Sequence, residues 1–189
     1  MHQRFYSLLL GTLLFFTCLD GFSQADSLRK FKTEGFWTGY GVELNPGIKY
    51  HVYYIAGEFS FPFNKRPRKN FLSWYLEPQF NLVNSGSNEF EFGMNIGLKN
   101  TIRLRNGMMF YQVIGSGPHM ITAELNRQAT GYIFSDNLGL GLLKRLHKNK
   151  PLFLNLQLRY RHISNASLKR PNSGIDNVNI ILGISGISE

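Results

Sequence analysis

The chain of 189 residues is poor in three features that often define a protein class: cysteine, acidic side chains and long apolar runs. Its one cysteine, Cys18, lies in an apolar N-terminal segment. Removal of that segment on export would leave no disulfide framework and no thiol chemistry. Beyond it, no stretch approaches the roughly 20 apolar residues of a spanning helix. The mature chain must therefore fold without disulfides and, if it enters a membrane, must do so without such a helix.

Acidic residues are few, with 12 Asp and Glu against 21 Lys and Arg and a net charge of +9. The basic residues do not cluster with aromatic side chains on one helix, so an anionic membrane surface explains the charge at least as well as nucleic acid does. We interpret the basic run Asn64–Asn70 as a solvated turn. His51, His119 and His147 lack metal-ligand spacing, so we predict no metal, no cofactor and no nucleic-acid partner.

Residues 1–25 have the features of a secretory signal peptide. A positively charged start precedes an almost wholly apolar stretch, Leu8–Leu19, and small residues suit cleavage near Ala25. A lipoprotein anchor at Cys18 is the alternative, but the residue before it is bulkier than such sites favour. We predict that residues 26–189 form one exported domain.

What the mature chain does contain is a series of segments in which apolar and polar residues alternate, the pattern of β-strands with one apolar face. Turn signals separate these segments. Eight strands are predicted, near Phe36–Leu44, His51–Phe61, Phe71–Leu82, Glu89–Leu104, Met108–Gly115, Gly131–Leu146, Leu152–Asn165 and Asp176–Ile187. Two fit less well. The fifth has apolar residues on both parities, and Pro78 in the third cannot donate a ladder hydrogen bond.

Alternation alone does not decide which face is outside, because a soluble barrel hides its apolar rows and a membrane barrel exposes them. The export signal, the lack of cysteine in the mature chain, the long alternating runs and the 14% aromatic content favour the membrane. In a bilayer every backbone group must pair, so the sheet has to close. We predict an all-β fold, an eight-stranded antiparallel transmembrane β-barrel of the bacterial outer membrane with periplasmic termini.

Connection lengths indicate the orientation of this barrel. The short connections, Arg105–Gly107 and His147–Pro151, follow even-numbered segments, whereas the longer ones, Ser116–Thr130 and Ala166–Ile175, follow odd-numbered segments. Outer-membrane barrels have short periplasmic turns and longer outer loops. The seventh segment therefore runs outward and ends at the level of the outer leaflet.

The apolar row of this seventh segment ends in polar residues. The even positions of Leu152–Ser164 are four leucines followed by Tyr160, His162 and Ser164. If the leucines face lipid, the histidine and the serine face lipid too. Two polar interfacial residues at the end of a strand would give the same pattern. Asp176, however, lies on the outward row of the next segment, and the connecting loop brings it across from the neighbourhood of His162.

Serine, histidine and aspartate on one patch predict a serine esterase. Ser164 would be the nucleophile, His162 its general base, and Asp176 the group that orients the imidazole. A tetrahedral intermediate also needs hydrogen-bond donors for its oxyanion, and Asn165 and Asn172 are nearby candidates. A carboxylate facing lipid is costly unless it is paired, which argues against an idle aspartate here.

These same stretches resemble a known family. Arg159–Ala166 and Pro171–Asp176 are similar to the signature of the PagL-type lipid A 3-O-deacylases, also called acyloxyacyl hydrolases, and Arg127–Phe134 resembles that family as well. The resemblance is specific mainly from Gly115 to Gly183. It implies an eight-stranded outer-membrane barrel whose Ser-His-acid triad faces the bilayer.

Matched residue by residue, the resemblance places the nucleophile at Ser164, the base at His162 and the acid at Asp176. It also associates Asn172 with the oxyanion hole. The best-known members have glutamate where this chain has Asp176, which shortens the acidic side chain by one methylene group.

We therefore predict an outer-membrane esterase that hydrolyses an ester-linked acyl chain of lipid A, the lipopolysaccharide anchor in the outer leaflet. Lys169 and Arg170 in the outer loop are candidate contacts for its phosphates, with solvated loop charge as the alternative. Two rivals remain: a non-catalytic barrel that is structural or binds a ligand, and a phospholipase or acyltransferase that uses the same site. The non-catalytic rival predicts no spatial relation between His162, Ser164 and Asp176.

Overall fold

The computed structural model describes residues 32–63 and 69–188. The predicted signal peptide with Cys18, and most of the basic run Asn64–Asn70, lie outside these residues. The strands are β1 Lys32–Glu43, β2 His51–Pro62, β3 Asn70–Asn84, β4 Asn88–Arg103, β5 Met108–Ser116, β6 Pro118–Ile121, β7 Gly131–His147, β8 Lys150–Ser164 and β9 Ile175–Ser188. No helix in these two ranges is long and apolar enough to cross a membrane.

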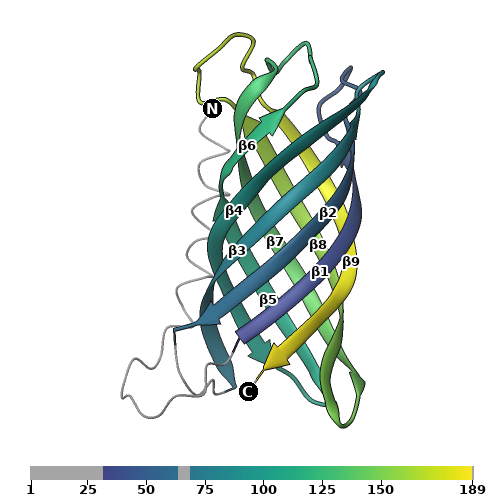
Figure 1. The fold of residues 1–189 in the computed structure, drawn as a ribbon, viewed down its shortest axis with the longest axis vertical. Coiled ribbons are helices and arrows are strands. Elements are labelled where there is room, and N and C mark those ends of the chain that lie inside the picture. The colour runs from purple at the N-terminus through teal and green to yellow at the C-terminus, as the bar shows by residue number, and fades with distance from the viewer. Residues whose placement is uncertain (1–31, 64–68, 189) are drawn as a thin grey trace.

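The sheet closes into a barrel of eight strand positions (Figure 1). Every neighbouring pair is antiparallel, and the first strand, β1, pairs along its whole length with the last strand, β9, from Lys32–Ser188 to Glu43–Asn177. Closure removes the sheet edges, which is the condition that a bilayer imposes on strands. The predicted eight-stranded antiparallel barrel is confirmed.

The predicted start of the longest loop, Ser116, is wrong. The fifth strand continues beyond it as β6, which pairs with β4 and β7 in the same register as β5 does. Between the two pieces lie Gly117, whose close approach to Met94 leaves no room for a Cβ, and Pro118, which has no N–H to donate. The Gly-Pro pair therefore interrupts the ladder without ending the strand, and the loop runs from 122 to 130.

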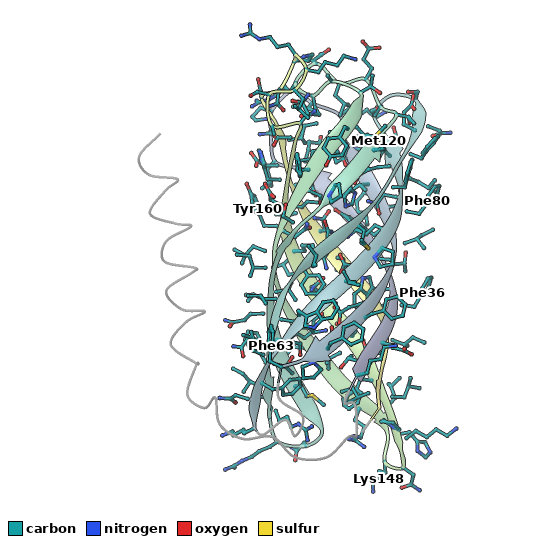
Figure 2. The ribbon with its side chains drawn as sticks, turned by 60° about the vertical axis from the view of Figure 1, so that its left-hand side comes forward. Phe36, Phe63, Phe80, Met120, Lys148 and Tyr160 are labelled. Carbon is teal, nitrogen blue, oxygen red and sulfur yellow. The ribbon has the colours of Figure 1, made fainter. Side chains whose placement is uncertain are left out.

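The alternation of apolar and polar residues matches the two sides of the barrel wall. Apolar side chains are exposed on the outer side, and Figure 2 shows Phe36 and Phe80 projecting from it. The interior holds buried charged side chains, among them Glu58, Glu77, Glu91, Lys99, Arg159 and Arg161. An apolar exterior around a polar interior is the arrangement of a transmembrane barrel and the reverse of a soluble one.

The interior charges are paired across the barrel. Arg159 makes two hydrogen bonds to Glu77, Nη1–Oε1 at 2.5 Å and Nη2–Oε2 at 2.6 Å. Lys99 Nζ lies 2.5 Å from Glu58 Oε1. Glu91 accepts from Arg161 and from Tyr50 and is bonded to His119. Since a lone buried charge is strongly destabilising, this pairing explains how such residues can fill the barrel.

The two strands that fitted their patterns poorly have local explanations. In β5, the second apolar row, including Met109, Tyr111 and Val113, belongs to an apolar cluster that fills one end of the barrel interior. In β3, Pro78 pairs with Met94 on one side, and on the other side the β2–β3 register skips it. The missing proline N–H thus coincides with a gap in the ladder.

The two ends of the barrel differ in their connections. One end, here called the turn end, carries the tight connections 104–107 and 148–149 and the end of β9 (Figure 1). The opposite end, here called the loop end, carries the connections 44–50, 85–87, 122–130 and 165–174. Inside the loop end, a second apolar cluster packs beneath these loops; it comprises Tyr50, Val52, Tyr54, Val83, Ile121, Ala123, Leu125, Ile133, Ile163 and Ile175.

Candidate active site on the outer wall

β8 carries His162 and Ser164 to the loop end on the outer side of the wall. The leucines on the same face are exposed, and Figure 2 shows Tyr160 on the outer surface. The residues between them, Arg159 and Arg161, point inward and are buried. The predicted sharing of one face by the leucines, the histidine and the serine is confirmed.

The register of β8 and β9 brings His162 and Asp176 together. The two residues are direct cross-strand partners, and the distance between His162 Nδ1 and Asp176 Oδ1 is 2.8 Å. Both side chains are partly exposed, 34% for the histidine and 18% for the aspartate. With Nδ1 engaged by the carboxylate, the other ring nitrogen, Nε2, is the one left for a reacting group.

Asp176 is held by three further contacts. The Tyr160 hydroxyl donates to Oδ1 at 2.5 Å, and Asn45 Nδ2 donates to Oδ2 at 3.2 Å. The backbone N–H of Asp176 donates to Asn45 Oδ1 at 2.6 Å. The carboxylate that faces His162 is therefore fixed in position and orientation, and its charge is compensated by hydrogen bonds.

Ser164 lies two residues beyond the histidine and is half-buried. Within the two described ranges, its hydroxyl makes no hydrogen bond with His162, so the structure brings the histidine and aspartate into contact and leaves the serine as a neighbour on the same face. Gly174 closes the other side of the imidazole: a Cβ on it would lie 2.5 Å from His162 Cε1 and 2.9 Å from Nε2. The absence of a side chain at Gly174 therefore leaves the room that the imidazole occupies.

The two asparagines predicted to support the site shape the loop that follows β8. The backbone N–H of Asn165 donates to Asn172 Oδ1 at 2.8 Å, and Asn165 Nδ2 donates to the carbonyl of Lys169 at 2.7 Å. Asn165 is buried, and both of these donors are already used. Asn172 Nδ2 has a single long contact, 3.4 Å to Ser167 Oγ, so it is the more available donor of the two.

A neighbouring loop supports this one. Ala129 N–H donates to the Pro171 carbonyl at 2.9 Å, and Ser173 N–H donates to the Arg127 carbonyl at 2.8 Å. These bonds tie the loop 165–174 to the loop 122–130. Lys169 and Arg170 lie at the exposed surface of the supported loop.

Some residues at the site were not predicted from the sequence. Asn45 comes from the β1–β2 connection, and Gly174 from the loop before β9. Asp136 on β7 is the cross-strand partner of His162 on the side opposite Asp176, and it accepts a hydrogen bond from Ser116 Oγ at 2.5 Å. Asp136 could have been found from its outward parity in β7, whereas the two loop residues carry no periodic signal.

No group of three or more His, Cys, Asp or Glu residues that could hold a metal ion occurs in residues 32–63 and 69–188. The chemistry that the described side chains themselves offer is acid–base and nucleophilic. A histidine oriented by a carboxylate can accept a proton from a neighbouring hydroxyl, which is the basis of ester hydrolysis by serine enzymes.

The fold and this patch define a class: an outer-membrane β-barrel with a histidine–carboxylate pair and a serine on its outer wall. The sequence identifies the family. Residues 58–185 match the family described as lipid A 3-O-deacylase (PagL), and the chain belongs to that family. Membership of this family makes the protein a lipid A deacylase of the bacterial outer membrane, and therefore a hydrolase.

Two solved structures share the architecture. The crystal structure of the outer membrane enzyme PagL is 17% identical, with a TM-score of 0.63, and the match covers 79% of this chain and 97% of PagL. Neisserial surface protein A is 7% identical, with a TM-score of 0.53, and the match covers 82% and 95% of the two chains. At these identities the likeness concerns the fold alone. A search of curated protein sequences gave no match.

Proposed function

We propose that this protein hydrolyses an ester-linked acyl chain of lipid A in the outer leaflet, with Ser164 as nucleophile, His162 as general base and Asp176 as the orienting acid. The observation that carries the proposal is the 2.8 Å contact between His162 and Asp176 on the outer wall of the loop end, beside the serine. A soluble substrate would not meet this face, whereas an acyl chain in the bilayer would.

The proposed reaction proceeds in two stages. Ser164 Oγ attacks the ester carbonyl carbon while His162 Nε2 takes the hydroxyl proton, and the resulting imidazolium is stabilised by Asp176. When the tetrahedral intermediate collapses, the C–O bond to the sugar breaks and the imidazolium returns its proton to the sugar oxygen. Water then attacks the acyl-serine with His162 again as base, which releases the fatty acid and regenerates the serine.

The oxyanion of the tetrahedral intermediate needs donors placed before the reaction. Asn172 suits this role because its amide nitrogen makes only a 3.4 Å contact within the loop. Asn165 is assigned a supporting role, since its backbone N–H holds Asn172 Oδ1 and its side chain holds the Lys169 carbonyl. Asn165 thus fixes the loop from which Asn172 would donate a hydrogen bond to the oxyanion.

The site's surroundings match an amphiphilic substrate that lies in the membrane. The exposed leucines of β8 below His162 offer an apolar surface for an acyl chain. Lys169 and Arg170 are exposed on the loop that follows Ser164, and we assign them as candidate contacts for the phosphates of lipid A. Short turns at the opposite end fit a periplasmic location for that end and an outer-leaflet location for the site.

Fatty-acid release from purified lipid A in detergent tests the proposal. Ser164→Ala and His162→Ala should each abolish release, and the double variant should lose no more than either single variant, because residues that act as one unit share one loss. Ser87→Ala at the loop end and His147→Ala at the turn end are matched controls remote from the site. Circular dichroism of each purified barrel establishes that it is folded.

A glycerophospholipid offered in the same assay separates the phospholipase alternative from lipid A deacylation. Release from the phospholipid alone would assign the site to a phospholipase. Full activity of Ser164→Ala on lipid A would refute the serine mechanism, and no activity of the folded wild-type barrel on any ester would favour a non-catalytic barrel.

A further inference from the structure

The connection between β1 and β2 enters the site because the barrel closes. β1 pairs with β9 (Figure 1), and past the last register pair the backbone N–H of Leu44 still donates to the Asp176 carbonyl at 2.8 Å. The next residue, Asn45, stands directly beside the aspartate, although 131 positions separate them in sequence. It lies outside residues 58–185, over which the chain matches its family.

The backbone of Asn45 is fixed by a tight turn. Its carbonyl accepts a 3.4 Å hydrogen bond from the N–H of Ile48. Between them stand Pro46 and Gly47, and the glycine has φ of 79°. Proline followed by a residue of positive φ is the signature of a type II turn. The side chain therefore starts from a rigid base and reaches sideways to β9.

Both ends of the Asn45 amide bind the same residue. Oδ1 accepts from the Asp176 backbone N–H at 2.6 Å, and Nδ2 donates to the Asp176 carboxylate Oδ2 at 3.2 Å. If the Asn45 amide were flipped, its NH₂ group would face the Asp176 backbone N–H and its oxygen would face the Asp176 carboxylate. An amide serves both partners at once, and a carboxylate in its place could serve only the backbone.

We propose that Asn45 is a positioning residue for the acid of the triad, so that the β1–β2 connection is part of the catalytic apparatus. This inference rests on the proposed function and deepens it. Tyr160 and His162 both bond Oδ1, whereas Asn45 holds Oδ2. Asn45 therefore resists rotation of the carboxylate about its Cβ–Cγ bond and keeps Oδ1 aimed at the imidazole.

Two substitutions separate positioning from support of the loop. Asn45→Ala removes both hydrogen bonds. Asn45→Asp keeps an acceptor for the Asp176 N–H but replaces the donor to Oδ2 with a second carboxylate. We expect both variants to lower kcat by about 10- to 100-fold with little change in KM, because a charge-assisted bond and the placement of the base are lost while substrate contacts remain.

The control is Asn84→Ala, another loop-end asparagine, whose Oδ1 accepts from the N–H of Gly86 at 3.3 Å. It should leave kcat and KM unchanged. In an Asp176→Asn background, Asn45→Ala should cause no further loss, since a residue that acts through the carboxylate has nothing left to position. All variants are assayed on purified lipid A as folded barrels in detergent, with Ser164→Ala alongside.

Wild-type kcat in Asn45→Asp would overturn the inference, because it would show that the bond to the backbone alone matters. An equal loss from Asn45→Ala in the wild-type and Asp176→Asn backgrounds would overturn it as well. If Ser164→Ala is inactive while Asn45→Asp is fully active, only the positioning role fails. If Ser164→Ala is active, the proposed function itself fails.

Discussion

The space beside the imidazole makes Gly174→Ala a sharp test of the site. Gly174 has φ of 71°, and a Cβ there would lie 2.5 Å from His162 Cε1, 2.9 Å from Nε2 and 3.2 Å from the Ile163 carbonyl oxygen. Real carbon atoms in contact stand about 3.5 to 4.0 Å apart. The added methyl group therefore collides with the ring that is proposed to carry the proton.

The expected losses of stability and of activity differ in origin. An alanine at this φ costs about 1 to 2 kcal/mol in backbone strain. To restore ordinary contact, the imidazole has to move by about 1 Å, which disturbs its 2.8 Å contact with Asp176. Because a displacement of about 1 Å at a reacting group can cost about 100-fold in rate, we expect kcat to fall by about that factor in a barrel that still folds.

Gly107→Ala is the matched control for the strain. Gly107 has φ of 70°, lies at the turn end, and would place a Cβ 3.3 Å from Arg145 Cβ. It should destabilise the barrel by a similar amount and leave deacylation unchanged. Urea unfolding measures the first effect, and fatty-acid release from lipid A measures the second. Wild-type activity in folded Gly174→Ala would refute the claim that the position of His162 controls the reaction.

Two further predictions concern the acid and the basic loop. Asp176→Asn should lower kcat by about 10³- to 10⁴-fold and yet leave more activity than Ser164→Ala, because it keeps the nucleophile and the base. Asp176→Glu should retain measurable activity. Equal inactivity of Asp176→Asn and Ser164→Ala would contradict this order. If Lys169 and Arg170 contact lipid A phosphates, alanine at each should raise KM by about 2- to 5-fold at constant kcat, since exposed ion pairs contribute little. Unchanged KM in both variants would assign these residues to solvated loop charge.

The alternation of apolar and polar residues predicted which way the site residues on the strands point, because a strand has only two faces. The exposed leucines of β8 determine where His162 and Ser164 point, and a shift of one residue would have moved all of them to the interior. The same rule predicted the outward position of Asp176. The contact between the histidine and the aspartate then follows from the antiparallel pairing of two consecutive strands.

The alternation did not predict the true extent of the strand that is interrupted at Gly117 and Pro118. Gly117 and Pro118 form a dipeptide that usually marks a turn, and the predicted fifth strand, Met108–Gly115, ends just before it. In the barrel, the strands on either side, β4 and β7, hold the chain in register across the break. The continuity depends on pairing with the strands that precede and follow this one, and the apolar–polar pattern around the dipeptide does not show that pairing.

Asn45 escaped prediction for a different reason, which concerns how a barrel assembles a site. In an open meander, the connection after the first strand and the start of the last strand would lie at opposite edges of the sheet. Closure makes β1 and β9 neighbours, and the loop end then brings the first connection against the Asp176 carboxylate. The need to pair every backbone group in the bilayer therefore does more than exclude open edges. It joins the two ends of the sequence at the site, so the contacts that orient the acid come from a part of the chain remote from the motif that carries the chemistry.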